Sequence, residues 1–368
     1  MFRTHHRFTR FAGAVLAAAV LLPVAQTGAQ TEFGRGAGVV SEFAAGLTNP
    51  RHIRFGPDGF LYVAEAGVGG SRLATTCPPV DNMFSQPGPY MAGFSGRISR
   101  IRPNGTRQTV ADGLPSVHDG LGDSLGPSDI AWIDKTMYLT LEGGGCSRGL
   151  ENDPAGIVRI NADGSYSYVA DITAFVRANP VANEPLCGPL GDCEPDGVPH
   201  SLLADGKWLY VVETNHNSLL RVNPKTGAIR RIYDLSVQDP APIMLIRDGK
   251  RFLLGGFDGL IQTFGRRFGP VSILDEGYGP IVDMTHAGGR LHLLETFALE
   301  TPWTPETGRV VRRNEDGTRT LVAAGLNFPI GMAKGRGLGY GGALYVSTVS
   351  YGQGPVEGLG RIVRIDLK

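Results

Sequence analysis

The chain of 368 residues carries 35 basic and 35 acidic residues, and 42% of it is hydrophobic. This balance, with no basic stretch beyond the first residues, argues against a nucleic acid as partner. The length suits one large domain, and the 53 glycines fall at turns and strand bends rather than in low-complexity tracts.

The first 29 residues have the pattern of a secretory signal peptide. Three arginines precede an apolar run, 11–25, and small residues are placed for cleavage after Ala29. The run is short for a membrane span, although an uncleaved anchor is the alternative. The sequence therefore predicts a signal peptide, 1–29, a mature domain, 30–368, no membrane span after cleavage, and a secreted or periplasmic protein.

A three-part phrase then recurs six times along the chain. Each copy begins with a proline and a short apolar run, and continues with a strand rich in β-branched and aromatic residues. It ends with a strand in which apolar residues alternate with arginine. The prolines are Pro50, Pro127, Pro199, Pro242, Pro280 and Pro329. Such a period predicts small sheets repeated around a ring.

Five of the six copies continue into a fourth strand. The sixth copy ends the chain after a third strand at 361–365, whereas a strand-like segment without a copy of its own, 39–43, opens the mature chain. If 39–43 pairs with 361–365, one sheet contains both ends of the chain. We therefore predict an all-β, six-bladed β-propeller whose last blade is closed by an N-terminal strand.

The long segments between strands are predicted to share one face of the ring. They all lie in second-to-third or fourth-to-first connections, which leave a four-stranded meander on the same side. These inserts are 67–95, 112–126, 143–155, 171–198, 298–307 and 348–359. One-sided inserts are typical of the binding face of a repeat scaffold, although they could merely cover the ring. We expect a monomer that binds a small molecule, glycan or protein there.

All four cysteines fall in the inserts. In an oxidising compartment they predict two disulfides, for which the sequence allows three connectivities. Cys187 and Cys193 could close a small loop, and Cys77 and Cys146 would then tie together the inserts of the first two blades. The spacing is unlike that of a zinc site.

Four glutamates occupy similar positions at the ends of second strands. They are Glu65, Glu142, Glu213 and Glu295. Carboxylates around the mouth of the central channel could bind Ca²⁺ or another hard cation. The alternative is that each glutamate accepts backbone N–H groups of the adjoining loop and has only a structural role.

Two further residues are the candidate catalytic groups. Asp129 and His200 do not recur from blade to blade, so the fold alone does not account for them. A metal ion could polarise a carbonyl or activate water, with His200 as general acid or base. A serine nucleophile has no Gly-x-Ser-x-Gly motif to support it. The expected ligand-binding residues are Arg51, His52, Ser128, Asn215 and His216.

The segment 43–67 resembles the opening of the ScyD/ScyE family of exported bacterial propellers. The segments 126–130 and 195–200 fit its next two blades, and the likeness extends over 39–235. It fades around 252–257, which lacks the Gly-Pro-Asp-Gly turn of the family. The resemblance implies an extracytoplasmic propeller, in some members encoded beside scytonemin biosynthesis, without an established reaction or catalytic residues.

Enzyme propellers share parts of the same phrase. The segments 46–50 and 61–65 are similar to soluble quinoprotein sugar dehydrogenases, which use pyrroloquinoline quinone (PQQ) and Ca²⁺, but their later His-containing cofactor segments are missing. The order of segments within each repeat also resembles that of NHL-like, streptogramin-lyase and calcium-dependent lactonase propellers. We expect a binding or accessory protein; the alternatives are a metal-assisted hydrolase, lyase or lactonase and a PQQ-dependent dehydrogenase.

Overall fold

The computed structural model describes most of the chain between Gly38 and Leu367. The residues outside the description are 1–37, 75, 78–79, 82–88, 121, 187–193, 338, 353, 355 and 368, together with the side chains of 76, 77, 80 and 81. The predicted signal peptide and the predicted Cys187–Cys193 disulfide therefore lie outside the described residues. Within the described part, no helix is both long and apolar enough to span a membrane.

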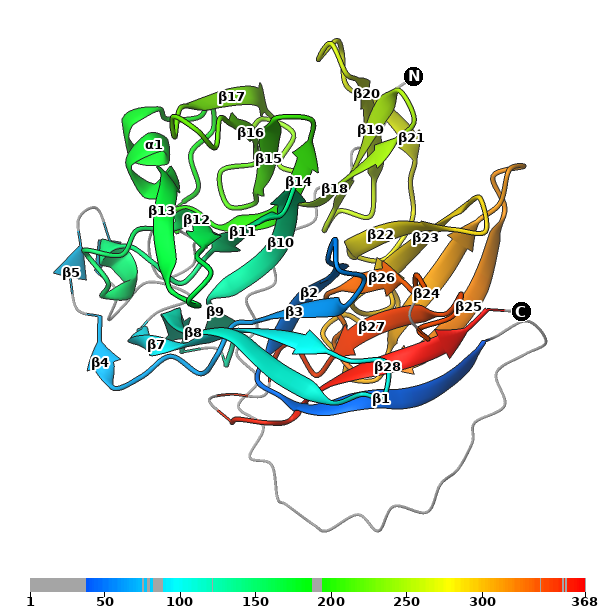
Figure 1. Ribbon diagram of the computed structural model, residues 1–368. Helices are drawn as coiled ribbons and strands as arrows, with labels where there is room; N and C mark the ends of the chain where they lie inside the picture. The colour runs from blue at the N-terminus through cyan, green and yellow to red at the C-terminus, as the bar shows by residue number, and fades with distance from the viewer. Residues whose placement is uncertain are drawn as a thin grey trace. The chain divides into compact units, whose positions relative to one another are not determined.

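Six small antiparallel sheets are arranged in a ring, so the chain is a six-bladed β-propeller (Figure 1). Every blade has four main strands; in blades 1 to 5 they follow one another as a meander, and in blade 6 the fourth strand comes from the N-terminal end of the domain. Blades 1 and 2 consist of β2 (Pro50–Phe55), β3 (Leu61–Glu65), β7 (Met91–Ile101), β8 (Arg107–His118), β10 (Pro127–Ile133), β11 (Thr136–Leu141), β12 (Gly156–Ile160) and β13 (Tyr166–Asp171). Blades 3 and 4 consist of β14 (Pro199–Asp205), β15 (Trp208–Glu213), β16 (Ser218–Val222), β17 (Ile229–Asp234), β18 (Pro242–Asp248), β19 (Arg251–Gly256), β20 (Ile261–Gly265) and β21 (Ser272–Asp275). Blades 5 and 6 consist of β22 (Ile281–Ala287), β23 (Arg290–Glu295), β24 (Gly308–Arg313), β25 (Arg319–Leu326), β26 (Met332–Lys334), β27 (Leu344–Thr348), β28 (Gly360–Asp366) and β1 (Val39–Leu47).

The two ends of the domain meet in blade 6, as the sequence predicted. Strand β1 pairs antiparallel with β28, and the register joins Val39 to Asp366 and Val40 to Ile365. Figure 1 shows this pair as the blue strand that runs beside the red one. The remaining edge of β28 pairs with β27, so the N-terminal strand completes the last sheet.

Six buried apolar clusters lie between neighbouring blades. The cluster between blades 6 and 1, for example, joins Leu47 and Tyr345 of blade 6 to Ile53 and Val63 of blade 1. Corresponding clusters lie between each other pair of neighbouring blades. Because both faces of a blade are covered by its neighbours, strands such as β3 are buried along their whole length.

A contact between neighbouring blades explains the repeated glycine and proline of the sequence phrase. A Cβ added to Gly96 would lie 2.6 Å from Cδ of Pro127, and one added to Gly308 would lie 2.5 Å from Cδ of Pro329. In both cases the glycine belongs to a third strand and the proline opens the next blade. The close approach therefore requires glycine at these positions.

The inserts contain more regular structure than the sequence predicted. Strands β7 and β8 extend well beyond the expected starts and ends and continue into the insert segments of blade 1. The other elements outside the blades are β4 (Arg72–Leu73), β5 (Thr76–Cys77), β6 (Val80–Asp81), β9 (Ser124–Leu125), the 3₁₀ helix η1 (Cys146–Arg148) and α1 (Ile172–Ala178). The helix α1 begins where the Asp171 carboxylate accepts the N–H of Ala174, an N-cap that the sequence analysis missed.

Candidate functional site

Three of the four predicted metal-binding glutamates hold the loop that enters their own blade. Glu65 accepts the N–H of Thr48 at 2.8 Å, and Glu213 accepts the N–H of Val198 at 2.7 Å. Glu295 accepts the N–H of Gly279 in the same way. These contacts match the structural alternative stated above.

Two of these glutamates also have arginine partners. Arg309 Nε lies 2.5 Å from a carboxylate oxygen of Glu295, and Arg107 lies 3.4 Å from Glu65. Among the residues that the structure describes, no group of three or more His, Cys, Asp or Glu side chains is arranged to hold a metal ion. The donor set therefore gives no support for a shared Ca²⁺ site, and the metal role of these glutamates stays a prediction.

Glu142 differs from the other three glutamates. Its Oε1 accepts a hydrogen bond from Nδ1 of His200 at 2.6 Å, and its Oε2 has no hydrogen-bond partner among the described residues. Burial raises the pKa of Glu142, but His200 and Arg51 outweigh that effect and hold the pKa below its ordinary value. Glu142 is therefore an ionised, buried carboxylate whose first partner is an imidazole.

A second imidazole and carboxylate lie beside this pair. His52 Nδ1 is 3.3 Å from Oδ2 of Asp283, and both side chains are fully buried. The rings of His52 and His200 meet edge to face, with 5.1 Å between their centroids. We call the four residues His52, Asp283, His200 and Glu142 the paired dyads.

The paired dyads bring together blades that are not neighbours in the ring. His52 lies on β2 of blade 1, His200 on β14 of blade 3, and Asp283 on β22 of blade 5. First strands line the central channel, and only there can such blades touch. Nε2 of both imidazoles is buried and lacks a hydrogen-bond partner in the described part of the chain.

Arg54, on β2, links the first strands of blades 2 and 5 through Asp129 and Asp283, and so contacts the paired dyads. Its two terminal nitrogens lie 2.9 Å from Asp129 and 2.9 Å from Asp283. Burial raises the pKa of Asp283, but the Arg54 guanidinium and the hydrogen bond from His52 hold it below its ordinary value. Arg54 therefore neutralises two carboxylates that face the channel.

Asp129 makes the contacts of a structural carboxylate. Its oxygens accept the N–H of Ile130 at 2.7 Å and the N–H of Leu202, in the next blade, at 3.0 Å. Asp283 does the same with the N–H groups of Met284 and Met332. Asp129 thus recurs in blade 5 as an inter-blade contact, and its predicted catalytic role has no support from its geometry.

Arg51 places a buried positive charge close to the paired dyads. Its Nη2 lies 2.9 Å from Oδ1 of Asp123, and it also contacts the carbonyl oxygen of Ser124. Burial lowers the pKa of Arg51, but the carboxylates of Asp123 and Glu142 raise it by more. The pKa therefore lies above its ordinary value, and the guanidinium stays charged. Its Nε has no partner among the described residues. Sequence analysis missed Asp123, which lies in the 112–126 insert.

The other predicted ligand-binding residues have partners within the protein. Ser128 Oγ donates to the carbonyl oxygen of His200 at 2.8 Å, and Asn215 Oδ1 accepts the N–H of Glu194 at 3.0 Å. His216 lies between two carboxylates, 3.2 Å from Glu213 and 3.8 Å from Glu184. Asn215 and His216 fix the end of β15 and the insert 171–198, whereas Ser128 holds the backbone of His200 in the paired dyads.

A buried ion pair holds the inserts of blades 1 to 3 together. The Arg148 guanidinium is fully buried, with Nη2 2.6 Å from Oε2 of Glu194, and the Tyr90 hydroxyl donates to the same carboxylate. Cys146 is disulfide-bonded. Because the other cysteine side chains lie outside the described residues, its predicted pairing with Cys77 stays a prediction.

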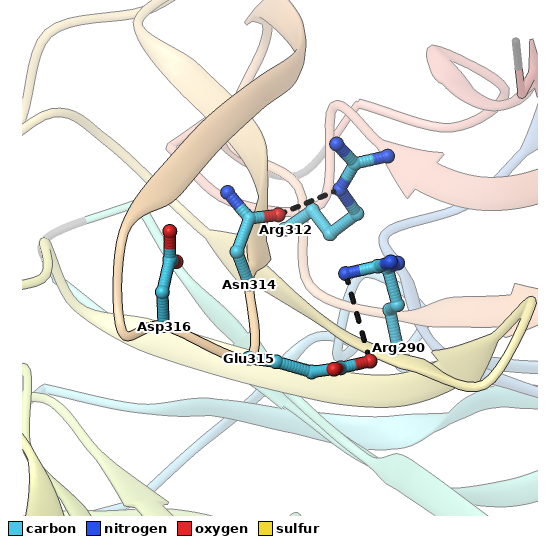
Figure 2. Close-up of a pocket in the computed structure, with 5 residues that line it drawn as sticks. All are labelled: Arg290, Arg312, Asn314, Glu315 and Asp316. Carbon is cyan, nitrogen blue, oxygen red and sulfur yellow. Dashed lines mark hydrogen bonds and ion pairs between the residues drawn. The ribbon is translucent and has the colours of Figure 1, made fainter.

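A shallow pocket lies on the opposite face, at the short turns of blade 5. Figure 2 shows its lining residues, Arg290, Arg312, Asn314, Glu315 and Asp316. Arg290 lies 3.9 Å from Glu315, and Arg312 Nε donates to Asn314 at 3.1 Å. Charges of both signs compensate one another there, so we favour the paired dyads as the functional site.

Comparison with known proteins identifies the fold and no family. No family model matches the chain, and no curated protein matches it. The chain is similar to a structure described as a proposed oxidoreductase (glucose dehydrogenase) from Thermus thermophilus, with 16% identity and a TM-score of 0.52. That match covers 90% of this chain and 100% of the other.

Two further solved structures give the same result. One is described as a proposed gluconolactonase, with 11% identity, coverage of 91% of this chain and 93% of the other, and a TM-score of 0.53. The other, from Bacteroides thetaiotaomicron, is of unknown function, with 12% identity, coverage of 89% and 76%, and a TM-score of 0.53. At these identities the likeness shows the propeller fold alone, and the ScyD/ScyE resemblance is not confirmed.

Proposed function

We propose that the protein binds a small polar molecule at the channel mouth, beside the paired dyads and Arg51. The observation that carries this proposal is a cluster of four buried polar atoms without hydrogen-bond partners among the described residues. They are Arg51 Nε, His52 Nε2, Glu142 Oε2 and His200 Nε2.

Buried polar atoms destabilise the folded protein unless they form hydrogen bonds. A buried polar group without a partner costs about 1–3 kcal/mol, and native proteins contain few of them. Arg51 can only donate, the ionised Glu142 can only accept, and a neutral imidazole bonded at Nδ1 offers a lone pair at Nε2. A molecule with both hydroxyl and carbonyl oxygens matches this set of donors and acceptors.

The same geometry favours hydrolysis of a lactone as a second candidate function. Glu142 orients His200 through Nδ1, which leaves Nε2 to act as a general base. Nε2 would take a proton from water as the water oxygen bonds to the carbonyl carbon, and Arg51 would stabilise the negative oxygen. The ring C–O bond then breaks, and the proton passes from His200 to the leaving ring oxygen.

This mechanism needs no metal ion, and we route no step through one. The engaged glutamates support that choice, because their oxygens already bind backbone N–H groups and arginines. A PQQ-dependent dehydrogenase activity, export and the monomeric state remain proposals from the sequence. The insert-bearing face is where we propose that partners bind.

The first probe is D-glucono-1,5-lactone, which one fold neighbour suggests and whose carbonyl and hydroxyl groups suit the site. We expect purified protein to release acid faster than spontaneous hydrolysis in a pH-stat assay. His200→Gln should lower kcat by about 100-fold or more because the general base is lost. His286→Gln is the control, since His286 is a surface residue that pairs with Asp248.

Binding is measured separately with the corresponding lactam, which does not hydrolyse. Calorimetric heat that is lost in Glu142→Gln, without acid release by the wild type, would support the binding function and remove the hydrolase. No heat and no acid release together would contradict both proposals.

A further inference from the structure

Five aromatic side chains form a continuous cluster of rings over blades 4 to 6 on the insert-bearing face. They come from four second-to-third or fourth-to-first connections, and we call them the aromatic platform: Phe257, Phe297, Trp303, Phe328 and Tyr351. Trp303 lies at the centre, with its ring centroid 5.0 Å from Phe297, 5.6 Å from Phe257 and 5.4 Å from Tyr351. Phe328 packs edge to face against Tyr351 at 5.8 Å.

The aromatic platform has buried rings that hold it in place and one ring that is exposed to solvent. Phe297 and Phe328 are buried, whereas 55% of Trp303 is exposed. Trp303 packs against three rings of the cluster and still presents more than half of its surface to solvent. Surface of this kind marks a binding site more often than an accident of folding.

Backbone strain is concentrated in the same loops. Ten described residues other than glycine have positive φ, and four of them belong to the platform loops: Trp303, Glu306, Phe328 and Val349, with φ between 39° and 60°. For bulky and β-branched residues this conformation is unfavourable, and it persists only where the surroundings enforce it. Strain of this kind gathers at ligand-binding sites, so it points in the same direction as the exposed ring.

The charged residues around the platform are mostly acidic. Glu300, Glu306 and Glu357 are exposed in the two loops that supply Trp303 and Tyr351. Arg309, in the strand that follows the Trp303 loop, is already paired with Glu295 at 2.5 Å and lies 3.7 Å from Glu300. An anionic ligand would meet repulsion here, whereas exposed carboxylates can accept hydrogen bonds from hydroxyl groups.

Two buried polar atoms lie directly beside the platform. Asn327 Oδ1 and Ser350 Oγ have no hydrogen-bond partner among the described residues, and Ser350 is completely buried. The two residues are adjacent, because Val349 N–H donates to the Asn327 carbonyl at 2.7 Å and Ser350 N–H donates to that of Phe328. They offer an acceptor and a hydroxyl next to the aromatic surface.

We propose that the aromatic platform is a stacking site for a neutral carbohydrate. One face of a pyranose ring carries C–H groups that suit the negative face of an indole ring, and its hydroxyl groups suit surrounding carboxylates. A quaternary ammonium ion is less suitable, because the rings pack against one another and do not surround a space. The proposal does not depend on chemistry at the paired dyads, although Tyr351 interacts electrostatically with Arg51.

Titration with three neutral hexasaccharides, of α-glucose, β-glucose and N-acetylglucosamine, tests the proposal. We expect saturable binding of at least one of them, measured by tryptophan fluorescence and by calorimetry. Trp303→Ala should weaken it by about tenfold or more, and Trp303→Phe, which keeps a flat ring, should stay within about threefold of the wild type. Tyr168→Ala, at an exposed aromatic on the outer strand β13, is the matched control and should change nothing.

Other outcomes would overturn the proposal. These are no saturable binding of any hexasaccharide, equal affinity in Trp303→Ala, or displacement of the bound sugar by choline chloride at equal concentration. A change of mass by light scattering in Trp303→Ala alone would instead identify the platform as a contact between copies of the chain. His200→Gln should bind hexasaccharides as the wild type does, which separates this site from the paired dyads.

Discussion

The two halves of the insert-bearing face use the same connections in opposite ways. Over blades 1 to 3 the inserts bury charge, as in the ion pair between Arg148 and Glu194. Over blades 4 to 6 the corresponding loops carry the aromatic platform, centred on the exposed Trp303. In one half the inserts bury paired charges, and in the other the loops expose an aromatic side chain.

The difference shows what the scaffold decides and what it leaves to the loops. The blades determine where each connection leaves the ring, since every second strand ends on the same face. The residue at that end then sets the local chemistry: Glu213 in blade 3 holds a loop, whereas Gly256 of blade 4 has no side chain to do so. A single face can therefore combine a proton-transfer site with a stacking surface.

The largest effect is expected from breaking the buried ion pair of the polar half. Arg148→Met should lower the free energy of unfolding by about 3–5 kcal/mol, because Glu194 would remain buried without its partner. Chemical denaturation measures the loss. Arg72→Met is the control, since Arg72 and Glu151 are both largely exposed, and it should stay within about 0.5 kcal/mol of the wild type. Equal effects of the two variants would contradict a closed polar half.

The comparison also assumes that the blades are alike beneath both halves. Gly96→Ala under the polar half and Gly308→Ala under the aromatic half should each cost about 1–3 kcal/mol, because both Cβ atoms would collide with a proline ring. Gly342→Ala has open space and is the control. A large cost at only one of the first two positions would mean that the two halves rest on different inter-blade contacts.

The loop after β19 of blade 4 contains an aspartate whose pKa is raised. Burial raises the pKa of Asp258 to about 6, although the Leu260 N–H lowers it. Since the folded protein holds this proton more tightly than the unfolded chain, stability should fall as pH rises from about 4 to 6. Asp258→Asn keeps an acceptor for Leu260 and should raise the free energy of unfolding at pH 7.5 by only about 0.5–1 kcal/mol, because Asp258 is exposed and water screens its charge. At pH 4 it should change little in the same urea series; a gain equal at both pH values would disprove the titration.

The smallest effect on stability is expected at the centre of the platform. Trp303→Ala should change the free energy of unfolding by no more than about 0.5 kcal/mol, because 55% of the residue is already exposed. Calorimetric melting checks this value. A loss of several kcal/mol would make Trp303 a structural residue and weaken the contrast between the halves.

The sequence predicted the propeller because its strands and turns are periodic. Six prolines, six second strands and the spare segment at 39–43 indicated six blades and the pairing of β1 with β28. The periodic contacts have a physical cause, since each blade must bury both of its faces against its neighbours. The strands β7 and β8 ran further than expected because their extensions do not follow the repeat.

The candidate site was predicted only in part. Sequence analysis named His52, His200 and Glu142 as candidate residues, and their roles stay a prediction. It did not predict the contacts of His52 with His200 and Asp283, since these join blades that are not neighbours. No period in the sequence encodes such distances. Sequence analysis treated Asp129 as unique because Asp283 lies one residue further from the proline of its own repeat. Both nevertheless make the same inter-blade contacts. The aromatic platform was missed because its members are spread over four loops.

The pairing of β1 with β28 has a consequence for the folding of the ring. β1 is synthesised at the beginning of the domain and its partner at the very end, so more than 300 residues must be in place before they meet. Until then β1 is an unpaired edge, open to pairing with other chains. Closing so large a loop is slow, and the last sheet should form late in folding. Because Val39 lies opposite Asp366, a short peptide between these ends and new termini at a distant turn would make a circular permutant that avoids the delay.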